Sequence, residues 1–183
     1  MQAKGLRESE LLPLSRCEDI FGFAVDTAHK LGVRDVEAMV GAGTHALTRF
    51  ANNTIHQNVA ERSGYLSIRV LLDGRTARAS TNQLDAEGVR RVVDEAVAIT
   101  RLQEPDPELL ALSEPAEYVP VQRYFSTTAD ITPIERAEAA REAIDAVESA
   151  AQTAAGIYAT GESALGLLNT QGVLAYHAET LAQ

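Results

Sequence analysis

Two short turn signals, Asn52-Asn53 and Asp73-Gly74, constrain this chain more than any other feature. Asn and Asp-Gly tolerate the positive φ angles that tight hairpins need, and both pairs stand between strand-like stretches. These stretches are Thr44–Ala51, Ile55–Glu61, Tyr65–Leu72 and Arg75–Thr81. In the third of them alternate residues are apolar, which directs Leu66, Ile68, Val70 and Leu72 to one side. The sequence therefore predicts a meander of short strands with one face against helices.

Three amphipathic stretches predict helices. The first opens with a capping box, Ser15-Arg16-Cys17-Glu18, and stops at Gly32. Its predicted buried stripe is Cys17, Ile20, Phe21, Ala24, Ala28 and Leu31. Asp85 caps the second helix, which ends near Leu102. The third begins at the capping box Thr132-Pro133-Ile134-Glu135, with proline at a position where its missing N–H costs nothing.

The remaining segments predict further strands and one long crossing. Val33–Val40 is a short strand candidate, and Gly41-Ala42-Gly43 is interpreted as the turn that follows it. Residues 103–130 hold four of the six prolines, which predicts an extended crossing over the surface with a short edge strand at Val119–Phe125. The last predicted hairpin consists of Gly156–Gly161, Ser163–Leu168, a turn at Asn169-Thr170-Gln171-Gly172, and Val173–Leu181.

Together these elements predict an α+β fold, with a mixed, largely antiparallel sheet of hairpins packed against about three helices. A weak internal similarity joins the first helix and hairpin to the third helix and hairpin, which is either two α-β-hairpin repeats or coincidence. Residues 1–14 are predicted to form a flexible arm and 15–183 a single α+β domain. The last predicted strand runs almost to the final residue with no closing element, which we expect at the edge of a domain in a longer protein.

Composition excludes some classes of partner. The net charge of −10 is spread along the chain, and no basic stripe is visible, which argues against direct binding to nucleic acid or to an anionic membrane. One cysteine, Cys17, precludes an internal disulfide and fits a reducing compartment. There is no apolar leader and no long apolar run, so the predicted location is cytoplasmic.

The sequence predicts neither a metal site nor a nucleophile. The four histidines, His29, His45, His56 and His177, are never followed by glutamate, so no HExxH or HExxxH helix can form. His177 and Glu179 are predicted to share a strand face, but a structural role is favoured over a metal site. Cys17 lies on an apolar stripe, which is typical of a buried structural thiol.

One dense polar cluster lies on predicted strands: Arg49, Asn52, Asn53, His56 and Asn58. Two interpretations stay open. The cluster can be a solvated sheet face with a hairpin turn. It can also be a peptide-facing surface, where Arg binds a carboxylate through two hydrogen bonds and Asn side chains satisfy the amides of an extended peptide. Arg69, Arg75 and Arg78 are predicted to form the solvated face of the second hairpin.

Three stretches carry a family resemblance: Arg49–Asn58, Gly64–Val70 and Ala79–Asp85. They resemble the amino-terminal domain of the TldD/PmbA (TldD/TldE) family, also called modulators of DNA gyrase. The resemblance extends over about Ser15–Leu181, and the entry to the second helix is similar to the PmbA/TldE-like branch. The family comprises zinc metallopeptidases and their metal-free paired subunits, which act in peptide maturation and proteolysis.

The resemblance implies a division of labour. The zinc-binding HExxxH helix of the family lies in its carboxy-terminal half, so no catalytic residue and no metal ligand can be assigned here. The implied function is that of a substrate-enclosing and dimerisation domain, with a peptide or protein substrate and either a homodimer or a paired TldD/TldE-type subunit. The alternative is a non-enzymatic interaction module that binds a peptide by adding it to a sheet edge.

Overall fold

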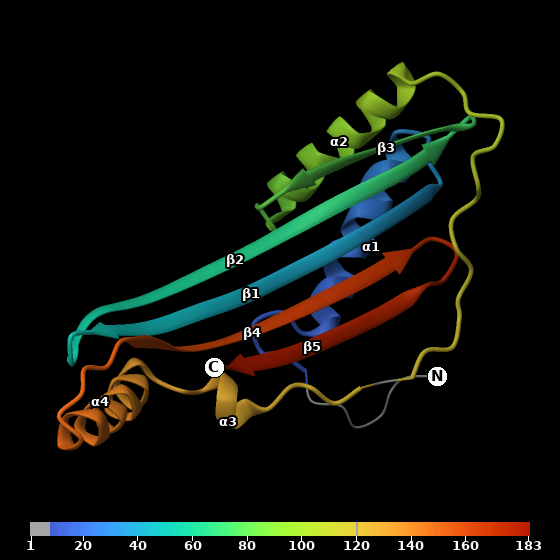
Figure 1. Ribbon diagram of the computed structural model, residues 1–183. Coiled ribbons are helices and arrows are strands. Elements are labelled where there is room, and N and C mark those ends of the chain that lie inside the picture. Colours follow the sequence, from blue (N-terminus) through green and yellow to red (C-terminus); the bar gives the residue numbers. More distant parts are fainter. Residues whose placement is uncertain (1–7, 120) are drawn as a thin grey trace.

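A computed structural model describes residues 8–119 and 121–183 of the chain. Five strands form one sheet in the order β3-β2-β1-β4-β5, and every neighbouring pair is antiparallel, which confirms the predicted α+β class (Figure 1). The strands are β1 (Asp35–Ala51), β2 (Thr54–Leu72), β3 (Arg75–Thr81), β4 (Gly156–Asn169) and β5 (Leu174–Ala182). The helices are α1 (Leu14–Lys30), α2 (Ala86–Leu102), the single turn α3 (Ser126–Ala129) and α4 (Pro133–Ser149).

The strands are longer than the sequence indicated. The predicted turn at Gly41-Ala42-Gly43 is wrong, because β1 runs through it and pairs on both sides with β2 and β4. Pairs of predicted short strands likewise merge into the 19-residue β2 and the 14-residue β4. Glycine inside a strand often marks a close approach rather than a turn, and the Tyr65 ring lies against Gly41, where a Cβ would collide with it.

Both predicted hairpin turns are confirmed. Asn52 and Asn53 have φ angles of 51° and 58°, and Asp73 and Gly74 have 50° and 72°. Positive φ at both central residues defines the turn whose twist matches that of the flanking strands. These turns set the register in which Val36 faces Val70 and Arg69 faces Arg78.

Two of the three predicted helix starts are confirmed. The Asp85 carboxylate accepts a hydrogen bond from the Gly88 N–H at 2.8 Å, and Thr132 and Glu135 form the reciprocal capping box of α4. The box predicted at Ser15 is wrong, because α1 begins one residue earlier and Ser15 lies inside it. The Glu8 carboxylate accepts from the free Leu14 N–H instead, at 2.9 Å. At the other end of α1, Gly32 has the left-handed φ of 82° that stops the helix.

The core lies between the sheet and two helices on one side of it. In Figure 1, α1 and α2 lie behind the strands, and in the described part of the chain no helix crosses the front face. The predicted alternation is confirmed, since Leu66, Ile68 and Val70 point toward the helices and are fully buried. They join a single cluster with residues of all five strands and both helices, among them Val36, Val40, Val89, Val93, Cys17, Ile20, Ala164 and Ala178.

The proline-containing segment crosses the ends of the strands. Asp106 N–H donates to the Gly74 carbonyl, and the Asn169 side chain donates to the Ser113 carbonyl, so residues 103–119 run along one end of the sheet (Figure 1). The predicted extended crossing is confirmed. The edge strand predicted at Val119–Phe125 is wrong for its described residues, which make one bridge from Arg123 to Glu179 and then enter the unpredicted turn of α3.

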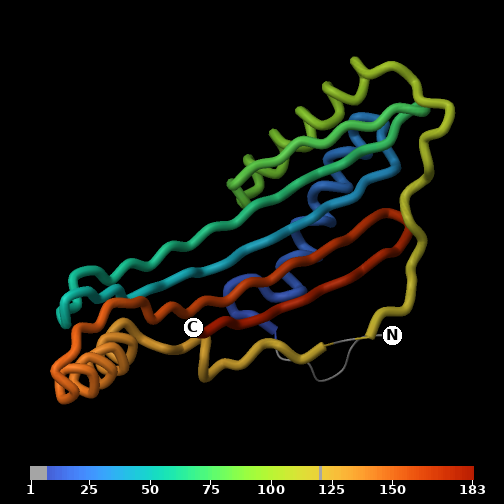
Figure 2. Tube along the Cα trace, viewed as in Figure 1, coloured from blue at the N-terminus to red at the C-terminus, as the bar shows by residue number. Residues whose placement is uncertain are grey.

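The order helix, strand, strand occurs twice, as α1-β1-β2 and as α4-β4-β5. In the sheet, β1 and β4 are adjacent, with β2 and β5 on their outer sides. The helices differ, because α1 lies across the sheet whereas α4 lies beyond one end of it (Figure 2). The duplication therefore stays a hypothesis.

The predicted arm spans residues 1–14, of which 1–7 lie outside the described residues. Within the remainder, Ser9 and Leu12 are buried. The Ser9 hydroxyl donates to the Glu162 carboxylate at 2.7 Å, and the Tyr176 hydroxyl donates to the Leu12 carbonyl at 2.7 Å. These bonds join residues 8–12 to β4 and β5.

Candidate functional site: the open face of the sheet

The side of the sheet opposite α1 and α2, here called the open face, carries every second residue of the strands. On β1, Glu37, Met39 and Gly41 face this side and alternate with the buried Val36, Ala38 and Val40. Cross-strand pairing then brings residues of all five strands into rows on this face.

The middle of the open face is apolar. One row places Tyr65, Gly41, Leu165 and His177 side by side on β2, β1, β4 and β5. The Tyr65 ring lies over the bare backbone of Gly41 and is 42% exposed, and Leu165 is 37% exposed. The next row contains Met39 and Leu167, which are half-buried. Accessible apolar surface on a rigid sheet is typical of a binding site.

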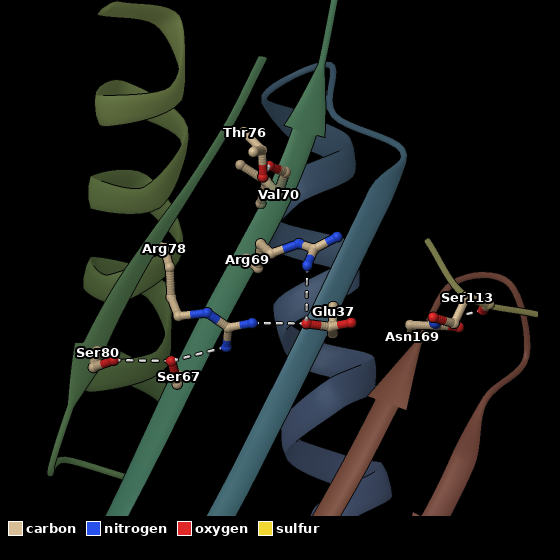
Figure 3. A network of polar contacts seen from close by, with 9 residues as sticks. All are labelled: Glu37, Ser67, Arg69, Val70, Thr76, Arg78, Ser80, Ser113 and Asn169. Atoms are coloured by element: carbon tan, nitrogen blue, oxygen red, sulfur yellow. Dashed lines mark hydrogen bonds and ion pairs between the residues drawn. The ribbon is translucent and has the colours of Figure 1, made fainter. Parts of the chain in front are cut away.

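Beside it lies a network of polar side chains (Figure 3). Arg78 donates to the Glu37 carboxylate at 2.7 Å and to the Ser67 hydroxyl at 3.1 Å, and Ser80 donates to Ser67 at 2.9 Å. Arg69 is 3.9 Å from the same Glu37 oxygen, which is an ion pair without a hydrogen bond. Arg69 and Arg78 belong to the solvated face predicted for the second hairpin, and Glu37 is a member that sequence reasoning missed. The prediction is wrong for Arg75, which pairs with Leu72 on the opposite face and donates to the Gln103 carbonyl at 2.9 Å.

A shallow depression of about 490 Å³ lies further along the strands. It is lined by Gly43, Thr44, His45, Glu61, Arg62, Ser63, Glu162 and Ser163. His45 and Glu61 are opposite each other in the register of β1 and β2, yet no hydrogen bond joins them in the described chain. The depression therefore holds polar groups but no assembled acid–base pair.

The structure divides the five predicted site residues. All five lie at or near the β1–β2 hairpin tip, and Asn52, Arg49 and His56 are exposed. Arg49 faces the open side, whereas Asn58 is on the other face and its amide donates to the Pro133 carbonyl at 3.5 Å. His56 is the extra residue of a bulge, because Arg49 pairs with Gln57 and the register then shifts.

The Asn53 side chain makes hydrogen bonds within the fold. Its side chain donates to the Gln152 carbonyl at 3.1 Å and accepts from the Ala154 N–H at 2.5 Å. The amide thus joins the first hairpin turn to the loop between α4 and β4. Its pairing partners cannot be read from local sequence, because they lie about a hundred residues away.

Histidine and acidic side chains do not gather into a metal site in the described residues, where no group of three or more His, Cys, Asp or Glu could hold an ion. His177 and Glu179 share a strand face as predicted, with His177 Nε2 3.7 Å from the Glu179 carboxylate. Arg123 is 3.4 Å from that carboxylate, so Glu179 already has a cationic partner.

Two titratable groups pack on the covered side, Cys17 fully buried and Tyr176 half-buried. Burial, followed by the nearby Glu8 and Glu18 carboxylates, raises the pKa of the Cys17 thiol to about 11. Burial likewise raises the pKa of the Tyr176 phenol to about 12. The burial predicted for the Cys17 thiol is confirmed. A raised pKa keeps a thiol protonated at neutral pH, which disfavours its reaction as a nucleophile.

These features define the class of protein: an α+β domain in which an antiparallel five-stranded sheet has helices on one face and a mixed apolar and polar surface on the other. Residues 36–100 match the family model described as PmbA/TldA metallopeptidase domain 1. This match confirms, over the segment from β1 to α2, the family resemblance inferred from the sequence.

Solved structures share this fold. TldE from Thermococcus kodakarensis superposes with a TM-score of 0.79 at 17% identity, covering 89% of this chain and 37% of that chain. A proposed modulator of a DNA gyrase from Thermotoga maritima gives 0.73 at 20% identity, covering 91% and 38%. A similarly described protein from Bacteroides thetaiotaomicron gives 0.70 at 19% identity, covering 90% and 39%. This chain thus spans well under half the length of these structures. No match was found among curated proteins.

Within the described residues, no helix is both long and apolar enough to cross a membrane.

Proposed function

We propose that this chain is a non-hydrolytic domain of a PmbA/TldD-type peptidase-family protein, and that its open face is a wall against which a peptide is held. The observation that carries the proposal is the uncovered sheet face, where Tyr65 and Leu165 are accessible beside an ordered network of hydrogen-bonding groups. The match to a metallopeptidase family's first domain supports a peptide as the ligand.

The proposed division of labour assigns zinc and hydrolysis to another segment of the family's proteins. It rests on the sequence, in which no histidine is directly followed by a glutamate, and on the position that the resemblance implies for the zinc motif. The proposal extends to a role in peptide maturation or proteolysis and to a cytoplasmic location, for which the single cysteine is the support. It also extends to pairing as a homodimer or with a TldD/TldE-type subunit, which the likeness to a TldE structure supports.

A binding experiment tests the wall. A fluorescein-labelled peptide of extended, apolar sequence is titrated with the purified chain, and fluorescence anisotropy reports the affinity. We expect Leu165→Asp to weaken binding by about tenfold, because a charge would replace apolar contact area. Leu102→Asp is the matched control, since Leu102 is 84% exposed at the end of α2, away from the open face.

The outcomes are distinct. Equal affinities for the two variants would refute the open face as the wall, provided that circular dichroism shows both to be folded. Tyr65→Ser is a second open-face variant in case Leu165→Asp unfolds. Hydrolysis of the peptide by the chain alone, or zinc retained at one ion per chain, would overturn the division of labour.

A second candidate function, strand addition by a non-enzymatic interaction module, is favoured by one observation. β3 pairs only with residues 66–72 of β2, so the outer edge of β2 from Thr54 to Tyr65 has no strand partner in the described chain. Unpaired strand edges bind extended peptides through backbone hydrogen bonds.

Two substitutions separate edge addition from binding to the open face. Arg49→Ala removes a side chain from the open face, and His56→Pro removes a backbone N–H of β2. Loss of peptide affinity only in the second variant would favour edge addition.

A further inference from the structure

We propose that the guanidinium groups of Arg69 and Arg78 form a carboxylate-binding site on the open face, which selects peptides that carry an acidic side chain. This inference rests on the proposed function and names the chemical class of peptide that the wall prefers. It adds a site of defined charge to the open face, whose apolar middle contacts apolar side chains of many different peptide sequences.

Positive charge exceeds negative charge around Glu37, where two guanidinium groups approach one carboxylate. Arg69 and Arg78 are direct cross-strand neighbours on β2 and β3, and both approach one oxygen, Oε1 of Glu37 (Figure 3). Like charges opposite each other in a sheet are destabilising unless an anion lies between them. Glu37 supplies a single negative charge for two positive ones. Asp35, the next acidic residue of β1 on this face, accepts a hydrogen bond from Gln171 at 3.3 Å.

Arg69 has unused donors. Its guanidinium donates no hydrogen bond to any other part of the described chain, and its Nε atom is buried without a partner. Its distance of 3.9 Å to Glu37 is too long for a hydrogen bond. The side chain is 31% exposed, so a ligand can reach it from the open face. A guanidinium has five N–H donors in a planar fork that matches a carboxylate, so Arg69 can bind one through two hydrogen bonds.

The surroundings fix the geometry of the site. Arg78 is held by Glu37 and by the Ser67 hydroxyl, and Ser67 is held in turn by Ser80. A ligand carboxylate would therefore meet one fixed and one available guanidinium. The row that contains Met39 and Leu167 lies between this site and Tyr65, so apolar side chains of the same peptide have a surface beside it. This arrangement favours a peptide carboxylate over a free anion.

Two substitutions test the site with opposite expected signs. Arg69→Gln removes the available guanidinium and is expected to weaken binding of a glutamate-containing peptide by about tenfold, since hydrogen bonds to charged groups contribute about 1.5–3 kcal/mol. Glu37→Gln removes the competing carboxylate and is expected to tighten the same binding several-fold. A network with a purely structural role would lose affinity in both variants.

The probes are two labelled peptides, amidated at the carboxyl terminus, that differ only in one glutamate or glutamine. Arg141→Gln on α4 is the matched control, because it makes the same charge change at an exposed position outside the site. We expect the chain to prefer the glutamate peptide and Arg69→Gln to abolish that preference, whereas Arg141→Gln keeps it. We also expect a free terminal carboxylate on the glutamine peptide to restore part of the preference.

Equal affinity for the two peptides, or the same effect of Arg69→Gln and Arg141→Gln, would overturn the site. Inorganic phosphate is titrated as a competitor against each peptide. The site would also be overturned if phosphate displaced the glutamate peptide and the glutamine peptide at the same phosphate concentration. If both peptides bind equally and binding still depends on Leu165, only this inference fails. If neither peptide binds, the proposed wall fails as well. Urea denaturation of each variant confirms that it is folded.

Discussion

The two faces of the sheet are built from the same strands, yet they follow different rules. On the covered face, Leu66, Ile68 and Val70 are fully buried against α1 and α2. The residues between them on β2, Ser67 and Arg69, belong to the open face and join a polar network there. Every second residue therefore belongs to the core, while the residues between them form a separate polar surface on which the Arg69 side chain is 31% exposed. Because the alternation period is two, one strand can serve both purposes without conflict.

The sharpest test of this difference is a pair of truncations. Ile68→Ala should lower the free energy of unfolding by about 2–5 kcal/mol, because it leaves a cavity in a close-packed core. Leu165→Ala on the open face should cost well under half as much, since that side chain is 37% exposed. Urea denaturation of both variants measures the difference. Equal losses would mean that the open face is itself a core surface.

A second pair asks whether the open face is uniformly tolerant. A Cβ on Gly161 would lie 2.5 Å from the Thr44 carbonyl oxygen, so Gly161→Ala must move the backbone. We expect a loss of about 1–3 kcal/mol, as for other overpacked sites. A Cβ on Gly41 would meet the Tyr65 ring, which can swing toward solvent, so Gly41→Ala should cost less. The reverse order of the two losses would contradict this account.

The helices of the covered face provide a third test. Asp85→Ala should lower stability by about 0.5–2 kcal/mol, because it removes the side chain that accepts the Gly88 N–H. Ser15→Ala should change stability little, since Ser15 lies inside α1 and its side chain makes no cap. Thermal unfolding followed by circular dichroism measures both. An equal loss of stability in Ser15→Ala would contradict the start of α1 described above, because it would mean that the Ser15 side chain caps the helix.

The fourth and smallest expected effect is a pH dependence confined to the covered side. Cys17 and Tyr176 have ordinary pKa values of 9.0 and 10.0, raised on folding to about 11 and about 12. Well below pH 9 both groups are protonated in the folded and unfolded states. At higher pH the unfolded chain loses these protons first, so stability falls as pH rises through this window.

Unfolding free energies measured from pH 8 to 11 check this slope. Cys17→Ala should flatten it, because the variant no longer contributes a buried thiol. A stability that rises over this range would contradict the burial of both groups.

Local chemistry predicted much of the fold, and contacts across the sheet account for what was missed. The turns at Asn52 and Asp73 and the caps at Asp85 and Thr132 follow from residues within a few positions of one another. Gly41 was misassigned because a glycine that admits a neighbouring ring has the same sequence signal as one in a turn. Ser15 fits the capping box pattern, but the chain entering α1 already satisfies the helix start through Glu8.

The candidate site was less predictable for the same reason. Arg69 and Arg78 share one face as predicted, whereas Arg75, predicted with them, lies on the other face because it is an odd number of residues from Arg78 on β3. Glu37 joins them only through the β1–β2 register, in which it faces Arg69. Alternation on each strand could have suggested Glu37 once that register was known. The predicted cluster at Arg49 and Asn58 was split between two faces, because the bulge at His56 shifts the register of β2 by one residue.

The position of β1 has a consequence for how the molecule is made. This strand is the first to be synthesised, yet it lies at the centre of the sheet and pairs with β4 from Glu37 to Phe50. A ribosome must add more than a hundred further residues before that partner emerges. Until then, the nascent chain presents an incomplete sheet edge, a state in which strands are prone to aggregation or depend on chaperones.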